Sequence, residues 1–240
     1  MPFHPDAIDG FRRAFSGDII TPGDDRYEEA RRVWNAMIDR RPALIARPRN
    51  AADVARCVRF AVDHRLPIAV RGGAHNVAGR GTCDDGIVVD FVDMKKIVVD
   101  PVARTAVAEP GVKWLELDRA TQAHGLATTG GTVGDTGIAG LTLGGGFGWL
   151  EGKLGMTVDN LLAADVVLAT GEQIRADANE NADLFWALRG GGGNFGIVTS
   201  FTYRLHEIGP TIIGGMVIHP FSEAKAVLTF YERFMKDAPA

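Results

Sequence analysis

The sequence predicts an α+β fold, and two features of its pattern carry that prediction. Near the N-terminus, two short apolar runs flank an amphipathic segment, in the order strand, helix, strand. Further along, short runs rich in β-branched residues are separated by turn residues, which is typical of antiparallel strands. With 240 residues, the chain is long enough for one large domain or two modest ones.

The first half of the chain contains the strand–helix–strand unit. Apolar side chains at helical spacing predict a surface helix over residues 26–39, and an apolar run predicts a strand at 43–46. Asn50 is placed to cap a helix over 51–65. The apolar stripe of that helix consists of Val54, Val58, Ala61 and Val62. Residues 68–70 then predict the next buried strand.

The second half alternates β-rich runs with shorter helical patterns. Its predicted strands are 87–91, 97–99, 105–108, two within 163–177 around a turn at Gly171, 197–205 and 212–218. Its predicted helices are 113–124, 182–189 and 223–236. Gly125 is expected to end the first of these helices. Asn181 is expected to cap the second, whose Phe185 and Trp186 are expected in the core. The strands between residues 87 and 108 suit a meander beside the first unit.

Composition and charge exclude several classes of function. The net charge is −4 at pH 7 and the basic residues are scattered, so no stripe could neutralise a row of phosphates and we expect no nucleic-acid binding. Cys57 and Cys83 form no C-x-x-C pair and the six histidines lack ligand spacing, so we expect no metal site and no disulfide. The N-terminus carries charges where a signal peptide is apolar, and no apolar run reaches membrane-spanning length. We therefore expect a cytoplasmic protein that binds no membrane.

Glycine is in marked excess, with 30 in 240 residues. Of these, 22 fall in three glycine segments, at 71–86, 125–156 and 190–196, which indicates loops where the backbone closely approaches another group. The third segment contains a G-x-G-x-x-G run, but a helix precedes it and a strand follows, the reverse of a dinucleotide-binding fingerprint. The first segment follows a strand and offers consecutive backbone amides beside the cation of Arg71. This arrangement could bind a pyrophosphate.

Four runs of the sequence are recognisable together. They are RPRNAADVARCVRFA, AVRGGAHNVAG, ATTGGTVGDTGIAGLTLGGGFGWL, and the stretch from VDNLLAADVVLATGEQIRAD to GGGGNFGIVTSFTYRLHEIGP. In this order, they resemble the FAD-binding domain of the flavin-linked oxidases related to berberine bridge enzyme, within the vanillyl-alcohol oxidase/p-cresol methylhydroxylase superfamily. The resemblance covers about residues 26–210 and implies a two-part FAD-binding domain of the p-cresol methylhydroxylase type.

The resemblance also implies how the chain is divided. A smaller part containing the βαβ unit would cover about 26–100, and a larger part, a mixed or antiparallel sheet with helices, about 101–210. Residues 1–25 would form an N-terminal segment. Residues 211–240 would be the start of a substrate domain that is otherwise absent.

Specific residues are implied to hold FAD. The family's R-G-G-x-H segment matches 71–76, so His75 would bond covalently to the flavin 8α-methyl group, because a neutral imidazole is nucleophilic near pH 7. Bicovalent relatives place a second, cysteinyl link near the start of the second glycine segment. This chain has Gly131, Thr132, Val133 and Gly134 there and no cysteine after Cys83, so we expect attachment through His75 alone. The residues expected to bind FAD are Arg71, Gly72, Gly73, Ala74, His75, Asn76, Val133, Thr136, Gly137, Gly140, Thr142, Gly145, Gly146, Gly193, Gly196, Ile197 and Val198. For the glycines, approach of the flavin ring and tight backbone packing are both open explanations. Asp159 and Asn160 match a D-N pair that we expect to fix a loop.

The function implied by the resemblance is that of an FAD-dependent oxidase. An organic substrate, such as a sugar, a phenol, an alkaloid or a polyketide-like compound, would give a hydride to flavin N5, and dioxygen would reoxidise the flavin. The catalytic base is expected in the substrate domain, so no catalytic residue is assigned within this chain. The alternative is an FAD-binding fragment without turnover of its own, whose apolar C-terminal elements would promote self-association.

Overall fold

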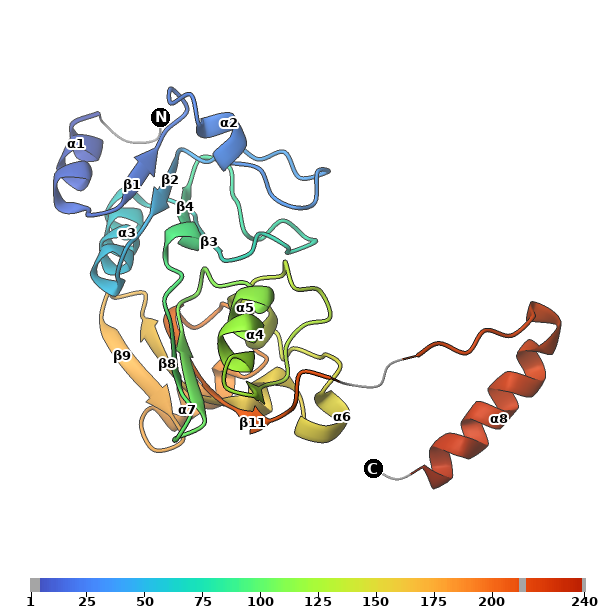
Figure 1. Ribbon diagram of the computed structural model, residues 1–240. Coiled ribbons are helices and arrows are strands. Elements are labelled where there is room, and N and C mark those ends of the chain that lie inside the picture. Colours follow the sequence, from blue (N-terminus) through green and yellow to red (C-terminus); the bar gives the residue numbers. More distant parts are fainter. Residues whose placement is uncertain (1–4, 212–214, 239–240) are drawn as a thin grey trace. The chain divides into compact units, whose positions relative to one another are not determined.

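The computed structural model describes residues 5–211 and 215–238, and for residues 5 and 6 the backbone alone. Contacts within the chain divide it into two compact units, Met1–Ile208 and Gly209–Ala240. The first unit contains two main sheets with helices packed against them (Figure 1). Among the described residues, every helix is too short or too polar to pass through a membrane.

The first sheet has four strands. Their order is β1 (Asp18–Ile20), β2 (Leu44–Arg47), β4 (Ile87–Asp90) and β3 (Ile68–Arg71). β2 and β3 run parallel to β4 on either side of it, and α3 (Ala51–His64) connects them, so the predicted strand–helix–strand unit is confirmed. The run at 87–91 was expected in a meander, but its strand β4 instead lies inside this sheet. All four residues of β4 are buried, and the strand pairs with β2 on one edge and with β3 on the other.

The helix α3 packs one face on the first sheet. The backbone amide of Asp53 donates to the Asn50 side chain at 2.9 Å, so the predicted cap is confirmed. Within the stripe, Val54, Val58 and Ala61 are buried as expected. Val62 is 61% exposed instead, because one residue along a helix turns the side chain by about 100° away from Ala61. A helix that the sequence did not predict, α1 (Pro5–Ala14), adds Phe11 to this core, stacked on Phe60 at 4.6 Å.

The predicted helix at 26–39 is wrong beyond its first turn. α2 covers only Tyr27–Ala30, and the chain after it is irregular. Contacts with a distant loop fix this ending: the Arg71 guanidinium donates to the Ala30 carbonyl at 2.6 Å, and the Trp34 amide donates to the Ala74 carbonyl at 3.1 Å. Trp34, which helical spacing had placed on an apolar face, is consequently 63% exposed.

The second sheet has five strands and is antiparallel throughout. Their order is β5 (Ile97–Asp100), β6 (Thr105–Ala108), β10 (Ile197–Arg204), β8 (Leu161–Val167) and β9 (Gln173–Asp177), and each agrees with a predicted strand. The helices α4 (Trp114–Gln122), α5 (Ile138–Leu143) and α7 (Ala182–Leu188) share its core, in which the Trp114 and Tyr203 rings lie 6.1 Å apart. The shorter elements are η1 (Phe91–Asp93), β7 (Leu126–Ala127), α6 (Glu151–Leu154), η2 (Thr157–Asn160) and β11 (His206–Glu207), with β7 and β11 paired.

The predicted turns and caps of this sheet have mixed outcomes. Gly125 and Gly171 have φ values of +66° and +79°, which suit glycine at a helix end and at a tight turn. Asn181 occupies the N-cap position of α7 as expected. Its side chain makes no capping hydrogen bond, because the side-chain amide donates to the Arg175 carbonyl at 2.6 Å. In α7, Phe185 is buried as expected, but Trp186 is 77% exposed and lies outside the core.

The second unit contains η3 (Phe221–Glu223) and α8 (Ala224–Asp237), so the predicted helix at 223–236 is confirmed. The predicted strand at 212–218 falls partly on residues 212–214, which lie outside the described residues, and residues 215–218 form no strand. The large exposed side chains of α8 are Leu228, Phe230, Tyr231, Phe234 and Met235.

Candidate cofactor-binding site

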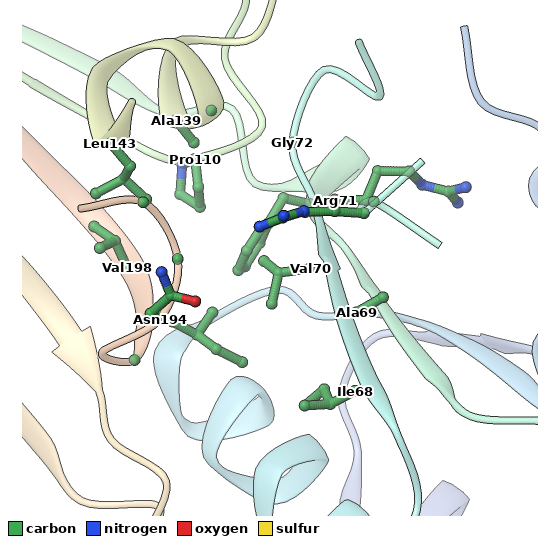
Figure 2. Close-up of a pocket in the computed structure, with 18 of the residues that line it drawn as sticks. Ile68, Ala69, Val70, Arg71, Gly72, Pro110, Ala139, Leu143, Asn194 and Val198 are labelled. Atoms are coloured by element: carbon green, nitrogen blue, oxygen red, sulfur yellow. The ribbon is translucent and has the colours of Figure 1, made fainter. Parts of the chain in front are cut away.

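One groove brings the three glycine segments together. It has a volume of about 960 Å³ and is lined by residues 71–76, by residues between 136 and 144, and by residues 190–198 (Figure 2). β3, the loop that follows it, α5 and the loop that precedes β10 supply these residues. Small-molecule sites have volumes of roughly 300–1,000 Å³, so the groove has room for a ligand the size of a large cofactor.

The loop after β3 presents its backbone to the groove, while the side chain of Arg71 is used elsewhere. The Arg71 guanidinium is buried and pairs with Asp90 at 2.9 Å, in addition to its bond to the Ala30 carbonyl. The expectation that this cation lies beside the loop amides is therefore wrong, because the guanidinium fixes the end of α2 instead. The backbone from Arg71 to Asn76 still lines the groove, and Ala74 has a φ of +62°.

The first and second glycine segments touch directly. A Cβ on Gly73 would lie 2.3 Å from the Gly137 nitrogen, and a Cβ on Gly137 would lie 2.4 Å from the Gly73 nitrogen. Neither position can carry a side chain unless the two loops separate. For Gly137, tight backbone packing is therefore a sufficient explanation.

Two other glycines open onto the groove. A Cβ built on Gly140, within α5, or on Gly193 would meet nothing within 4 Å, although both residues line the groove. A side chain there would project into the space that a ligand would use. The residues present therefore fit a flat or extended cofactor that approaches the backbone closely.

Apolar side chains also face the groove. Ile68 and Val70 were expected in a buried strand, but they are 41% and 40% exposed and point into the groove from β3 (Figure 2). Alternation along this edge strand buries Ala69 and presents its two neighbours to the groove. The exposed Arg65 and Arg80 line the groove as well, and no sequence motif had singled them out.

His75 lies in the groove within a chain of contacts. Its Nε2 atom is 3.3 Å from Asp135 Oδ2, and the other carboxylate oxygen of Asp135 pairs with Lys113. The Trp34 ring stacks on the imidazole with the ring centroids 5.5 Å apart and the planes inclined by 22°. Hydrogen bonds from Lys113 first, and from His75 second, hold the pKa of Asp135 below its ordinary value, so this carboxylate is ionised.

Thirteen of the seventeen residues expected to bind FAD line the groove, and four lie away from it. Val133, Gly145 and Gly146 belong to the second glycine segment, but they are not among the residues that line the groove. Thr142 is fully buried and shares a 2.8 Å hydrogen bond with the Tyr203 hydroxyl. A Cβ on Gly146 would lie 2.5 Å from Thr157, so its role is packing.

The remaining sequence expectations concern a loop pair and two thiols. The Met156 backbone amide donates to the Asp159 carboxylate at 2.8 Å, and the Asn160 side-chain amide donates to the carbonyl of Leu154 at 3.0 Å, so this pair fixes a loop as expected. Cys57 is buried within α3, and burial raises the pKa of the half-buried Cys83 to about 11. Neither sulfur lines the groove.

Comparison with known proteins identifies the family. Residues 42–177, more than half of the chain, match the family model described as an FAD binding domain. The chain belongs to this FAD-binding family. The resemblance to flavin-linked oxidases drawn from the sequence and the predicted α+β FAD-binding fold are both confirmed.

Individual relatives of this FAD-binding chain are oxidoreductases. It is 36% identical over 235 residues to an FAD-linked oxidoreductase of Dictyostelium discoideum, a match that covers 97% of this chain and 51% of that protein. The crystal structure of 6-hydroxy-D-nicotine oxidase from Arthrobacter nicotinovorans is 37% identical, with a TM-score of 0.88 over 92% of this chain and 49% of that one. A glucooligosaccharide oxidase from Acremonium strictum, whose structure is named for its 6-S-cysteinyl, 8α-N1-histidyl FAD, is 31% identical, with a TM-score of 0.77 over 84% of this chain and 42% of that one. The chain thus spans about half the length of the relatives it matches.

Proposed function

We propose that the protein is an FAD-dependent oxidase whose flavin is attached covalently through His75. Bound FAD would supply the redox chemistry, taking a hydride from an organic substrate at flavin N5 and passing the electrons to dioxygen. The observation that carries the proposal is the meeting of three glycine segments in one groove that His75 also lines. The names of relatives, which specify a nicotine derivative and a sugar, support a small organic molecule as the substrate.

The chain's own residues would hold FAD by three kinds of contact. The backbone of residues 71–76 would donate hydrogen bonds to the pyrophosphate, with charge from Arg65 or Arg80 in place of Arg71. Gly140 and Gly193 would let the cofactor approach the backbone. The apolar side chains that line the groove would cover the flat parts of the cofactor and exclude water from them.

His75 would form the covalent link, and it would be the sole link. Neither thiol lies in the groove, and residues 131–134, near the position that bicovalent relatives use for their cysteine, include no cysteine. The covalent bond would keep FAD in place independently of the hydrogen bonds that hold the pyrophosphate.

The base that takes the substrate's proton is proposed to lie outside the FAD-binding domain, which we assign to residues 26–210. Among the described residues that line the groove, His75 is the one side chain of a type that commonly serves as a general base, and the flavin bond would occupy it. This observation favours a second candidate function, an FAD-binding fragment without turnover of its own. Residues 211–240 would then begin the substrate domain.

Acid precipitation after incubation with FAD tests the attachment. The wild-type protein should give a yellow pellet and a colourless supernatant, whereas His75→Ala should release its flavin. His124→Ala, an exposed histidine at the end of α4, is the matched control and should behave as wild type. A colourless wild-type pellet under a yellow supernatant would refute the covalent bond. Peroxide production with sugars, phenols and alkaloids separates the two candidate functions, because the fragment would produce none.

A further inference from the structure

The side chains around His75 hold its imidazole ring in one orientation, which FAD binding alone does not require. Asp135 contacts the imidazole Nε2 on one side and Lys113 on the other, and the Trp34 ring covers one face of the imidazole. The three partners come from different parts of the chain, at positions 34, 113 and 135. The contacts of Asp135 and Trp34 restrict the orientation of the imidazole, and Lys113 holds the Asp135 carboxylate. The proposed role of this ring is to form one bond in a fixed direction.

The backbone that carries Asp135 is fixed to the start of α4. The Leu115 amide donates to the Gly134 carbonyl at 2.9 Å, and the Trp114 amide donates to the Thr136 carbonyl at 3.0 Å. Thr136 also donates from its hydroxyl to the Val133 carbonyl at 2.9 Å. The carboxylate of Asp135 is thus presented from a rigid turn, although its side chain is 65% exposed.

The chemistry of the contact selects one form of the histidine ring. An ionised carboxylate can only accept hydrogen bonds, and a neutral imidazole has one N–H donor. The contact with Asp135 therefore requires the proton on Nε2, which leaves the lone pair on Nδ1. A carboxylate that orients an imidazole in this way also stabilises the positive charge that the ring acquires when it reacts.

We propose that Asp135 is a positioning residue for flavin attachment: it holds His75 as the Nε2–H tautomer, so that Nδ1 forms the bond to the 8α-carbon. The proposal rests on the proposed attachment through His75. Bond formation at Nδ1 turns the ring into an imidazolium, whose charge Asp135 balances until the Nε2 proton leaves to solvent. The hydrogen lost from the 8α-carbon departs as a proton, and the electron pair of that C–H bond reduces the flavin, from which dioxygen removes it.

The tautomer can be measured in the protein without FAD. With ¹⁵N-labelled histidine, at a pH where the ring is neutral, wild-type His75 should show nitrogen shifts of a single tautomer with the proton on Nε2. Asp135→Ala should show a mixture of both tautomers, while Asp135→Asn, which keeps an oxygen acceptor, should retain the Nε2–H form. Asp93→Ala removes an exposed carboxylate elsewhere and should match wild type. Equal tautomer mixtures in wild type and Asp135→Ala would overturn the proposal.

The second readout is the rate at which acid-stable flavin forms. Asp135→Ala should slow attachment by roughly tenfold or more, the effect typical of losing a partner that orients a histidine. Its dissociation constant for FAD, measured in a His75→Ala background where no bond forms, should be unchanged. Attachment at the wild-type rate, or a linkage through Nε2, would contradict the role of Asp135. If the wild type forms no acid-stable flavin, the proposed attachment fails, and the tautomer measurement still decides whether Asp135 orients His75.

Discussion

A substitution at Gly140 should affect the stability of the fold and the binding of FAD in opposite directions. It lies inside α5, where alanine is a better helix former, and a Cβ there meets no atom within 4 Å. Replacing glycine by alanine within a helix typically stabilises it by about 0.5–1 kcal/mol. For a chain of this size, this corresponds to a rise in melting temperature of about 1–4 °C. Gly140→Ala should therefore make the protein without FAD more stable.

The same methyl group should weaken FAD binding, because it projects into the groove that Gly140 lines. Inserting a methyl group into a packed site typically costs about 1–3 kcal/mol, which is roughly a 5- to 150-fold increase in the dissociation constant. Gly140→Leu, which adds more bulk to the same position, should bind FAD more weakly still. Stability and affinity should thus move in opposite directions.

Thermal melts without FAD and fluorescence titrations with FAD, both in a His75→Ala background, measure the two effects. Gly10→Ala is the matched control: Gly10 also lies inside a helix, α1, and a Cβ there also meets nothing within 4 Å, but it lies away from the groove. That variant should gain the same stability and keep its affinity for FAD. Wild-type affinity in Gly140→Ala would refute the assignment of the groove as the flavin site.

Three further outcomes follow from the structure. Burial raises the pKa of Asp118 to about 6, so the folded state binds more protons than the unfolded state and stability should fall as pH rises from about 4 to 6. Asp118→Asn should remove this fall and gain about 1–2 kcal/mol above pH 6 in urea denaturation, allowing for the partial exposure of the group. Gly137→Ala should lose about 1–3 kcal/mol in the same assay, because its Cβ would lie 2.4 Å from the Gly73 nitrogen; an unchanged midpoint would show that the loops can separate. The double variant Cys57→Ala, Cys83→Ala should keep acid-stable flavin, and its loss would place a thiol at the cofactor.

The elements that the sequence predicts correctly are those that local chemistry decides. The cap at Asn50 needs contacts only within one helix, and the strands of the second sheet follow from the β-rich composition of their own runs. The glycine segments could be recognised as ligand loops because their glycine content is visible in the sequence. Their convergence in one groove could not be predicted from the sequence, since it depends on how the two sheets are joined.

The errors lie where a distant residue decides the outcome. The helix expected at 26–39 ends early because Arg71, about forty residues further on, bonds to the Ala30 carbonyl. This hydrogen bond and the ion pair with Asp90 hold the Arg71 guanidinium away from the groove. Asp135 lies sixty residues from His75, and no pattern within the sequence signals that they meet.

The central claim, attachment of FAD through His75, is tested most directly by peptide mapping. Trypsin cleaves after Arg71 and Arg80, so residues 72–80 are released as the peptide GGAHNVAGR, in which His75 is the only nucleophilic side chain. After incubation with FAD, unfolding and digestion, the flavin absorbance should co-elute with this peptide in chromatography, and the peptide mass should be increased by the mass of the cofactor. Recovery of the unmodified peptide in full yield, with flavin free in solution or carried by another peptide, would contradict the account.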